Sequence, residues 1–431
     1  MKKMLLLSVS MILAIGILVG CAGTPATSGT PGAGTVAPGE QPAPGAQERI
    51  PIELWHYQVA ITAEYLTEAI ANYNARPESL VYVTLQYLPR NELIARYILG
   101  VVSGDLPEIG FADNPDSAAL SAMGMWIDIT DRVNAMGYEW LEGPINSGRF
   151  EGRQYTIPVR SNCLALWSNN EMMERAGVER LPETWDEFID VLTQLRDALP
   201  GVDPLALSAQ RTEESTFQFL PFLLSTGATW DNVDSPEGVR ALTLFQTLID
   251  NRLMSPEVIN WVQNDVQKQF AAYNAAMMIN GSWQIPNMAR DNPNIEYTIS
   301  LIPRDRYFAT SLGGENAGMT IAARPIEDYV WDFMAWWHSA ETSKWYNMVN
   351  GTISTNRSVT VEMKYGDDPI QAAFAQQIVY AVPRGPHIHW PELSNHIQEA
   401  IQAVLTGAAT PEAAAAEAGA RIAQINAGML D

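Results

Sequence analysis

The stretch Ile52-Glu53-Leu54-Trp55-His56-Tyr57 decides the fold, because its alternating apolar and polar residues are typical of a β-strand. Apolar residues at helical spacing then predict a helix over Glu64–Ala75, and Leu80–Tyr87 alternates like a second strand. A second helix is expected from Asn91, as its N-cap, through Val102, and a third strand over Pro107–Ala112. Strands and helices that alternate in this order predict a parallel sheet in an α/β fold.

A similar pattern resumes after Arg149 and continues to the end of the chain. Thr184 and Glu187 have the spacing of a capping box. Proline is expected at the first helical position in Ser235-Pro236, Ser255-Pro256 and Thr410-Pro411. Further strands are predicted at Tyr155–Val159, Cys163–Ser168, Pro204–Ser208, Ala275–Ile279, Tyr297–Ile302 and Ala317–Ala322. Further helices are predicted at 171–176, 327–350, 369–380, 391–406 and 411–427.

The N-terminus has the composition of a secretory signal. Two lysines precede the apolar and small-residue run Met4–Gly20, which is shorter than the about 20 apolar residues that span a bilayer. The run ends in Leu18-Val19-Gly20-Cys21, which resembles a bacterial lipobox; an ordinary signal followed by a chance cysteine is the alternative. We therefore expect a signal peptide over 1–20 and acylation of Cys21, which anchors an extracytoplasmic protein to the cell membrane.

The composition of the 431 residues is that of an acidic globular protein, with a formal net charge of −23 and 47% hydrophobic residues. An acidic surface repels nucleic acid and anionic lipid headgroups, so neither is expected as a partner. Residues 21–49, rich in Ala, Thr, Pro and Gly, are predicted to form a disordered tether. If Cys21 carries lipid, Cys163 has no cysteine to pair with, and its apolar neighbours predict a buried, inert thiol.

Several blocks of the folded part occur in the order in which one protein family has them. The most frequent in that family is Pro182–Phe188, preceded by Ala176-Gly177. The other blocks are Leu106–Asp113, Tyr155–Val159 with Asn162 and Trp167–Asn169, Phe270–Trp283, Gly313–Asn316, Pro383–Pro386, Trp390-Pro391 and Ile397–Ala400. By these blocks the chain resembles the extracellular solute-binding proteins of bacterial ABC importers, of the sugar-binding, maltose-binding-protein-like type. Two departures from the family pattern, Asn274 and His387–His389, are expected to affect the pocket rather than the fold.

The resemblance implies a periplasmic-binding-protein-like fold of type II, with two α/β lobes, a central cleft and hinge strands that cross between the lobes. Lobe 1 is expected to comprise residues 50–158 and about 303–350, and lobe 2 residues 159–302 and about 351–431. In the family, the lobes close on a solute by hinge motion and a permease recognises the closed form. The implied function is a monomeric receptor that binds a sugar or oligosaccharide and presents it to an ABC permease.

Aromatic side chains are candidates for sugar binding, because flat rings pack against the apolar faces of pyranoses. The resemblance places Trp283 at the cleft. Trp390 begins a helix after a loop, where ligands commonly bind, and Trp230 with Asp231 lies in a turn after a glycine. Packing in the core is the alternative role of each tryptophan.

Polar candidates stand where predicted strands end. Asp113 follows the third strand, and His56, Tyr57 and Gln58 end the first, at the sheet edge where open α/β folds bind ligands. Gly313 and Gly314 precede Glu315, and two consecutive glycines let the backbone approach a ligand closely. For all of these, a solvated loop or a turn hydrogen bond is the alternative. The remaining polar candidates are Asn162, Glu315, Asn316 and Arg384.

Neither catalysis, nor a metal site, nor a cofactor is expected. The sequence lacks nucleophile, P-loop and dinucleotide signatures, and the pair His387 and His389 lacks the remaining ligands of a zinc site. Three alternatives stay open: a non-sugar solute such as a polyamine, a secreted glycoside hydrolase with paired carboxylates, and a sensor partner of a membrane receptor.

Overall fold

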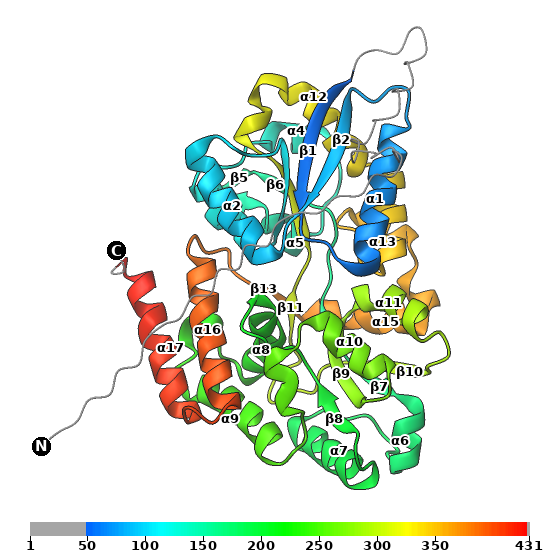
Figure 1. The fold of residues 1–431 in the computed structure, drawn as a ribbon, viewed down its shortest axis with the longest axis vertical. Helices are drawn as coiled ribbons and strands as arrows, with labels where there is room; N and C mark the ends of the chain where they lie inside the picture. Colours follow the sequence, from blue (N-terminus) through cyan, green and yellow to red (C-terminus); the bar gives the residue numbers. More distant parts are fainter. Residues whose placement is uncertain (1–48, 429–431) are drawn as a thin grey trace, which may run out of the picture. The chain divides into compact units, whose positions relative to one another are not determined.

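The computed structural model describes residues 49–428, whose helices and strands are drawn in Figure 1. The expected signal peptide over 1–20, the expected lipidation of Cys21 and the expected tether, up to residue 48, lie outside the described residues. None of the helices within 49–428 combines the length and the hydrophobicity that a membrane span requires.

Five strands form the first sheet, in the order β2-β1-β3-β12-β6. The strands β1 (Ile50–His56), β2 (Val81–Tyr87) and β3 (Ile109–Asp113) are parallel, which confirms the prediction from their alternation with helices. The late strand β12 (Glu315–Met319) runs antiparallel between β3 and β6 (Thr156–Pro158). A segment from the last third of the chain therefore lies inside a sheet that the N-terminal part begins.

Helices cover this sheet and bury its apolar side chains. The helices α1 (Ala60–Asn74), α12 (Glu327–Trp337) and α13 (Ala340–Asn350) share one core with β1 and β3. The helix predicted over 327–350 is two helices, because Ser339 adopts an extended backbone and accepts a hydrogen bond from Thr342 N as the cap of α13. The helix α2 (Arg90–Ser103) begins two residues earlier than a cap at Asn91 predicts. Asn91 is not its cap, since Pro89 already has the extended backbone that precedes a helix.

The second sheet has four strands in the order β10-β7-β9-β8. The central strands β7 (Leu164–Asn169) and β9 (Ala275–Gly281) are antiparallel and buried along their whole length. The edge strands are β8 (Asp203–Ala206), parallel to β9, and β10 (Tyr297–Ser300), antiparallel to β7. Apolar clusters pack on both faces, and Cys163 is buried in one of them, where burial raises the pKa of its thiol.

Helices surround the second sheet, and four elements there begin at a predicted capping signal. Thr184 Oγ1 accepts from Glu187 N at 3.3 Å and Glu187 Oε2 accepts from Thr184 N at 3.1 Å, which confirms the capping box. Pro236 and Pro411 are first residues of helices, whereas Pro256 begins a 3-10 helix. These helices are α6 (Asn170–Ala176), α7 (Trp185–Ala198), α8 (Glu213–Thr226), α9 (Pro236–Asp250), α10 (Gln263–Ala271), α11 (Ile285–Asp291), α15 (Pro369–Gln377), α16 (Trp390–Leu405) and α17 (Pro411–Asn426).

The remaining elements of the described residues are short. The short helices are α3 (Asp116–Ala122), α4 (Thr130–Ala135), α5 (Glu142–Asn146) and α14 (Arg357–Glu362). The short strands are β4 (Arg149–Phe150), β5 (Arg153–Gln154), β11 (Thr310–Leu312) and β13 (Ala381–Pro383). The 3-10 helices are η1 (Trp230–Asn232), η2 (Pro256–Asn260), η3 (Ser282–Gln284), η4 (Ile321–Ile326), η5 (Tyr365–Asp367) and η6 (Ile378–Tyr380).

Three segments of the chain meet where it passes from one sheet to the other. Asn162, between β6 and β7, exchanges backbone hydrogen bonds of 3.0 and 2.9 Å with Gly313, between β11 and β12. Ser161 exchanges two backbone bonds of 2.8 Å with Ile353. Gly314 has φ +132°, and a Cβ there would lie 2.2 Å from Arg160 O, so only glycine fits this crossing.

Candidate functional site

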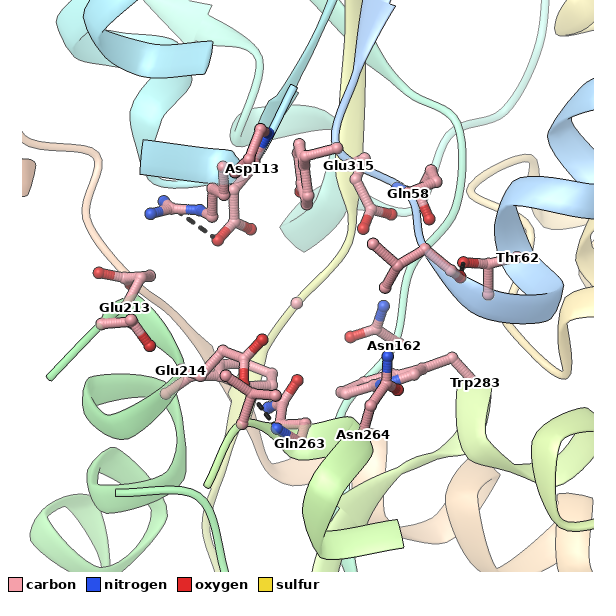
Figure 2. Close-up of a pocket in the computed structure, with 18 of the residues that line it drawn as sticks. Gln58, Thr62, Asp113, Asn162, Glu213, Glu214, Gln263, Asn264, Trp283 and Glu315 are labelled. Carbon is pink, nitrogen blue, oxygen red and sulfur yellow. Dashed lines mark hydrogen bonds and ion pairs between the residues drawn. The ribbon is translucent and has the colours of Figure 1, made fainter. Parts of the chain in front are cut away.

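A cavity of about 530 Å³ is lined by loops and helix ends from the parts of the chain that form the first and the second sheet (Figure 2). From the first sheet and its helices come Tyr57, Gln58, Val59, Thr62, Tyr87, Pro89, Arg90, Asn91, Asp113 and Glu315. From the second come Thr212, Glu213, Glu214, Phe217, Val262, Gln263, Asn264, Asp265, Lys268, Trp283 and Asn287. The crossing segments and the loop after β13 add Arg160, Asn162, Gly313, Gly314 and Arg384.

Strand register brings two carboxylates together on one wall of the cavity. Asp113 is the last residue of β3, Glu315 is the first of β12, and the antiparallel pairing places them opposite each other. Gln58 follows β1, the parallel neighbour of β3, so it reaches the same edge. Figure 2 shows the three side chains on this wall. The wall thus lies at the carboxyl edge of the parallel strands, where open α/β folds bind ligands.

Arg160 holds the Glu315 side of this wall. Its Nη2 donates to Glu315 Oε1 at 2.9 Å and to Gln58 Oε1 at 2.6 Å, and its Nε donates to Glu315 Oε2. Its Nη1 donates to Asn350 Oδ1 at 3.2 Å. Because Arg160 is buried and engages both oxygens of Glu315, the carboxylate is fixed in one orientation and its charge is matched.

Arg384 joins the Asp113 side of the wall to helix α8. Its two terminal nitrogens donate to the two oxygens of Asp113 at 2.9 and 2.7 Å. Its Nη1 also donates to Glu213 Oε1, in the first turn of α8, at 2.7 Å. Trp390 Nε1 donates to the same oxygen at 3.0 Å, and Ser394 Oγ donates to the other oxygen of Glu213. All five residues of this network are buried, so it is shielded from screening by salt.

Two aromatic rings of the cavity adjoin Arg384 in succession, first Phe217 and then Trp283. The Arg384 guanidinium lies 4.4 Å from the ring centroid of Phe217, and the rings of Phe217 and Trp283 are 6.2 Å apart at 34°. The Trp283 indole packs against Gly281, where a Cβ would lie 1.8 Å from the ring. Trp283 remains partly exposed in the cavity, so its ring is available to a ligand.

Burial changes the acidity of several groups at the site. Burial raises the pKa of Asp116 to about 7, against the attraction of Arg90, whose Nη2 lies 2.5 Å from Asp116 Oδ2. Burial also raises the pKa of the Tyr57 phenol well above its ordinary value, with smaller contributions from Glu315 and Asp113. Both groups therefore keep their protons more readily than they do in water, and Tyr57 stays a neutral hydrogen-bond donor.

The wall from the second sheet carries amides and a further carboxylate. Glu214 Oε2 accepts from Gln263 N at 2.6 Å and from Ser208 Oγ at 3.3 Å. Figure 2 shows Glu214, Gln263, Asn264 and Trp283 along this wall, facing Asp113 and Glu315. Burial raises the pKa of Glu214.

Seven of the twelve side chains that the sequence indicates for the ligand line this cavity: Tyr57, Gln58, Asp113, Asn162, Trp283, Glu315 and Arg384. Five lie elsewhere. His56 is buried and its Nδ1 accepts from Gln58 N, while the amide of buried Asn316 donates to Ser117 and Ser147. Trp390 is fully buried beneath Glu213, and the ring of Trp230 packs against it, with Asp231 next in the chain. Contact of any of these residues with a ligand stays a prediction.

Five further residues line the cavity although the sequence did not indicate them: Arg90, Arg160, Glu213, Glu214 and Phe217. The sequence could have indicated Arg160 as a site residue, because it lies two residues before Asn162 in the first crossing block. Glu213 and Glu214 stand in the first turn of α8, where acidic residues are common for helix-dipole reasons alone. From the sequence alone, these two glutamates could contact a ligand or only stabilise the start of the helix.

Groups of three or more metal-ligating side chains are absent from the described residues 49–428. Most carboxylates of the cavity are already paired with arginine. The arrangement suits hydrogen bonding and ring stacking to a small polar solute.

Two sequence comparisons show which family the chain resembles. The model of the family described as bacterial extracellular solute-binding protein matches residues 68–373. The diacetylchitobiose binding protein DasA of Streptomyces coelicolor is 23% identical over 72% of this chain and 74% of its own length.

Solved structures confirm the predicted two-lobed fold. An ABC transporter solute-binding protein from Thermotoga lettingae, bound with α-D-tagatose, has a TM-score of 0.80 at 24% identity, covering 87% of this chain and 99% of that one. The maltose-bound MalE3 protein of T. maritima has a TM-score of 0.79 at 20% identity, covering 87% of this chain and 100% of its own.

Proposed function

Because this chain belongs to the family of bacterial extracellular solute-binding proteins, we propose that it binds a sugar or oligosaccharide in the cavity between its two sheets. The observation that carries the proposal is the combination of the Trp283 ring with fixed carboxylates and amides around one cavity. An indole packs on the apolar face of a pyranose, while carboxylate, amide and guanidinium groups bond its hydroxyls. The names of similar proteins, which mention diacetylchitobiose, tagatose and maltose, support this ligand class.

The charges of the cavity favour a sugar over a polyamine. A polyamine requires several carboxylates without partners, but Arg384 already pairs with Asp113 and Glu213, and Arg160 with Glu315. Paired carboxylates still accept hydrogen bonds from hydroxyls through their remaining lone pairs.

Binding is proposed to close two lobes about the crossing segments, without covalent chemistry on the ligand. The proposed lobes are 50–158 with about 303–350, and 159–302 with about 351–431. The crossings at Asn162, Gly313 and Ile353 are short and lie side by side, which suits a hinge. The closed form is proposed to present the ligand to the transmembrane subunits of an ABC permease, from a monomer outside the cytoplasm that Cys21 anchors by lipid.

Titration of the protein against saccharides tests the proposal. We expect at least one mono- or oligosaccharide to give saturable heat in calorimetry and a change in tryptophan fluorescence, with an affinity near micromolar, about −8 kcal/mol. Putrescine and spermidine in the same assay test the polyamine alternative, and chromogenic glycosides test for hydrolysis. Tight binding of a polyamine with no response to any saccharide, or turnover of a glycoside, contradicts the proposal.

A further inference from the structure

Glu214 differs from the other carboxylates that line the cavity. Within residues 49–428, Asp113 and Glu213 pair with Arg384, Glu315 pairs with Arg160, and Asp265 lies 3.2 Å from Lys268. No lysine, arginine or histidine of these described residues lies within ion-pair distance of Glu214. Its charge therefore has no direct counterion in the cavity.

One oxygen of Glu214 is left for a ligand. Gln263 N and Ser208 Oγ both donate to Oε2, which holds the carboxylate in place. Oε1 receives no hydrogen bond from the described residues, and it is not among the polar atoms sealed from solvent. The carboxylate is thus oriented by its neighbours and presents a free acceptor in the cavity.

The more distant charges leave Glu214 uncompensated. Arg90 attracts it, but Arg90 itself lies 2.5 Å from Asp116 and 3.5 Å from Asp113, while Asp265 repels Glu214. The residues that line the cavity include five carboxyl groups and four basic groups, an excess of one negative charge. Asp116, which lies behind the wall and pairs with Arg90, adds another carboxyl group. Burial raises the pKa of Glu214, as expected for a charge without a partner.

We propose that the saccharide bound in this cavity carries one protonated amine, which donates to Glu214 Oε1. This inference rests on the proposed sugar-binding function and specifies its ligand as an amino sugar or an oligosaccharide that contains one. A hydroxyl donor would leave the carboxylate charge of Glu214 without a counterion, whereas an ammonium group neutralises it. One amine suffices, because the remaining carboxylates have basic partners.

Matched ligands test the inference in the unmodified protein. Glucosamine and galactosamine, alone and within disaccharides, are compared by calorimetry with the hydroxyl sugar of the same configuration and with its neutral N-acetyl derivative. The measurements are made at about pH 6, below the usual pKa of such an amine. We expect the amine form to bind about tenfold more tightly than both neutral forms, because hydrogen bonds between charged groups are stronger than neutral ones.

The variant Glu214→Gln assigns the preference to this side chain. It keeps an oxygen that accepts from Gln263 N but removes the charge, so the ratio of amine to hydroxyl affinity is expected to fall to near one. The control Glu174→Gln removes the same charge from the exposed surface of α6 and should keep the wild-type ratio.

The results of these titrations distinguish a failure of the amine preference from a failure of sugar binding. Equal binding of amine and neutral sugars by the wild-type protein, or an amine preference that persists in Glu214→Gln, overturns the inference and leaves sugar binding intact. Failure of every saccharide to bind overturns both. If the variant does not fold, the wild-type comparison still decides whether the cavity prefers an amine over a hydroxyl.

Discussion

Asp113 and Arg384 stand 271 positions apart in the chain, yet two nitrogens of the guanidinium bond both carboxylate oxygens at 2.7 and 2.9 Å. The contact connects the end of β3 with the loop after β13, and Glu213 extends it to α8. It thereby links elements of both sheets at the edge of the cavity. Because all three groups are buried, this network affects both the stability of the chain and the shape of the site.

Replacing Arg384 with alanine leaves Glu213 buried without its cation and leaves Asp113 with only the more distant Arg90, at 3.5 Å. We expect the free energy of unfolding to fall by about 3–5 kcal/mol, the usual cost of breaking a buried pair from one side. Urea denaturation followed by circular dichroism measures it. Arg180→Ala is the control, since Arg180 pairs with Glu187 on the surface with 70% of its side chain exposed. An equal loss in the two variants contradicts the prediction.

Replacing Trp283 with alanine removes the partly exposed ring of the cavity. The affinity for the bound saccharide is expected to fall by about tenfold or more, because the ring loses both its burial against the sugar and its stacking. Calorimetry measures the affinity. Trp331→Ala, a partly buried tryptophan on α12 outside the cavity, should bind like the wild type. Unchanged binding in Trp283→Ala removes this residue from the site.

A side chain at Gly281 tests whether the position of Trp283 matters. A Cβ at residue 281 lies 1.8 Å from the indole, so Gly281→Ala forces the ring to move. We expect a shifted tryptophan emission spectrum and weaker saccharide binding from a folded protein. Gly366→Ala serves as the control, since a Cβ there meets no atom within 4 Å. Wild-type affinity in Gly281→Ala means that the ring orientation does not contribute.

Acid is expected to destabilise the fold through two buried histidines. Burial lowers the pKa of His338 and of His56 to about 4 each, whereas the unfolded chain takes up the proton near 6.5. The unfolded state therefore binds more protons between these values, and the stability present above about pH 6.5 is lost as the pH falls toward 4, by up to about 3 kcal/mol per histidine.

Urea midpoints measured between pH 7 and pH 4.5 check this dependence on pH. His338→Gln and His56→Gln should each flatten the curve, and the exposed His389→Gln should retain the wild-type slope. A curve that keeps its full slope in both buried variants shows that other groups cause the acid sensitivity.

The proposed lipid anchor can be tested by changing its expected acceptor. Cys21→Ser is expected to give an unlipidated precursor or a soluble product, because serine lacks the thiol that is acylated. Metabolic labelling with a fatty-acid probe and fractionation of membranes measure this. A variant that still incorporates the probe contradicts the anchor, and Cys163→Ser, a buried cysteine, should be labelled like the wild type.

Part of the candidate site could be predicted because it depends on strand ends. Asp113 and Gln58 follow strands whose alternation is visible in the sequence, and the parallel order of those strands brings their carboxyl ends to one edge. Trp390 shows the opposite case. Its position at a helix start was predicted correctly, but the indole is fully buried against Glu213 and does not line the cavity.

The sequence by itself determined the local elements, such as the alternation along β1, the capping box at Thr184 and the prolines that begin α9 and α17, because these depend only on residues a few positions apart. Only the tertiary structure decided which charges meet. The late strand β12 enters the first sheet antiparallel and brings Glu315 to Asp113, and the loop after β13 brings Arg384 to both sheets. Such contacts depend on how distant segments pack. The periodicity of the sequence therefore does not reveal that Glu214 lacks a basic partner.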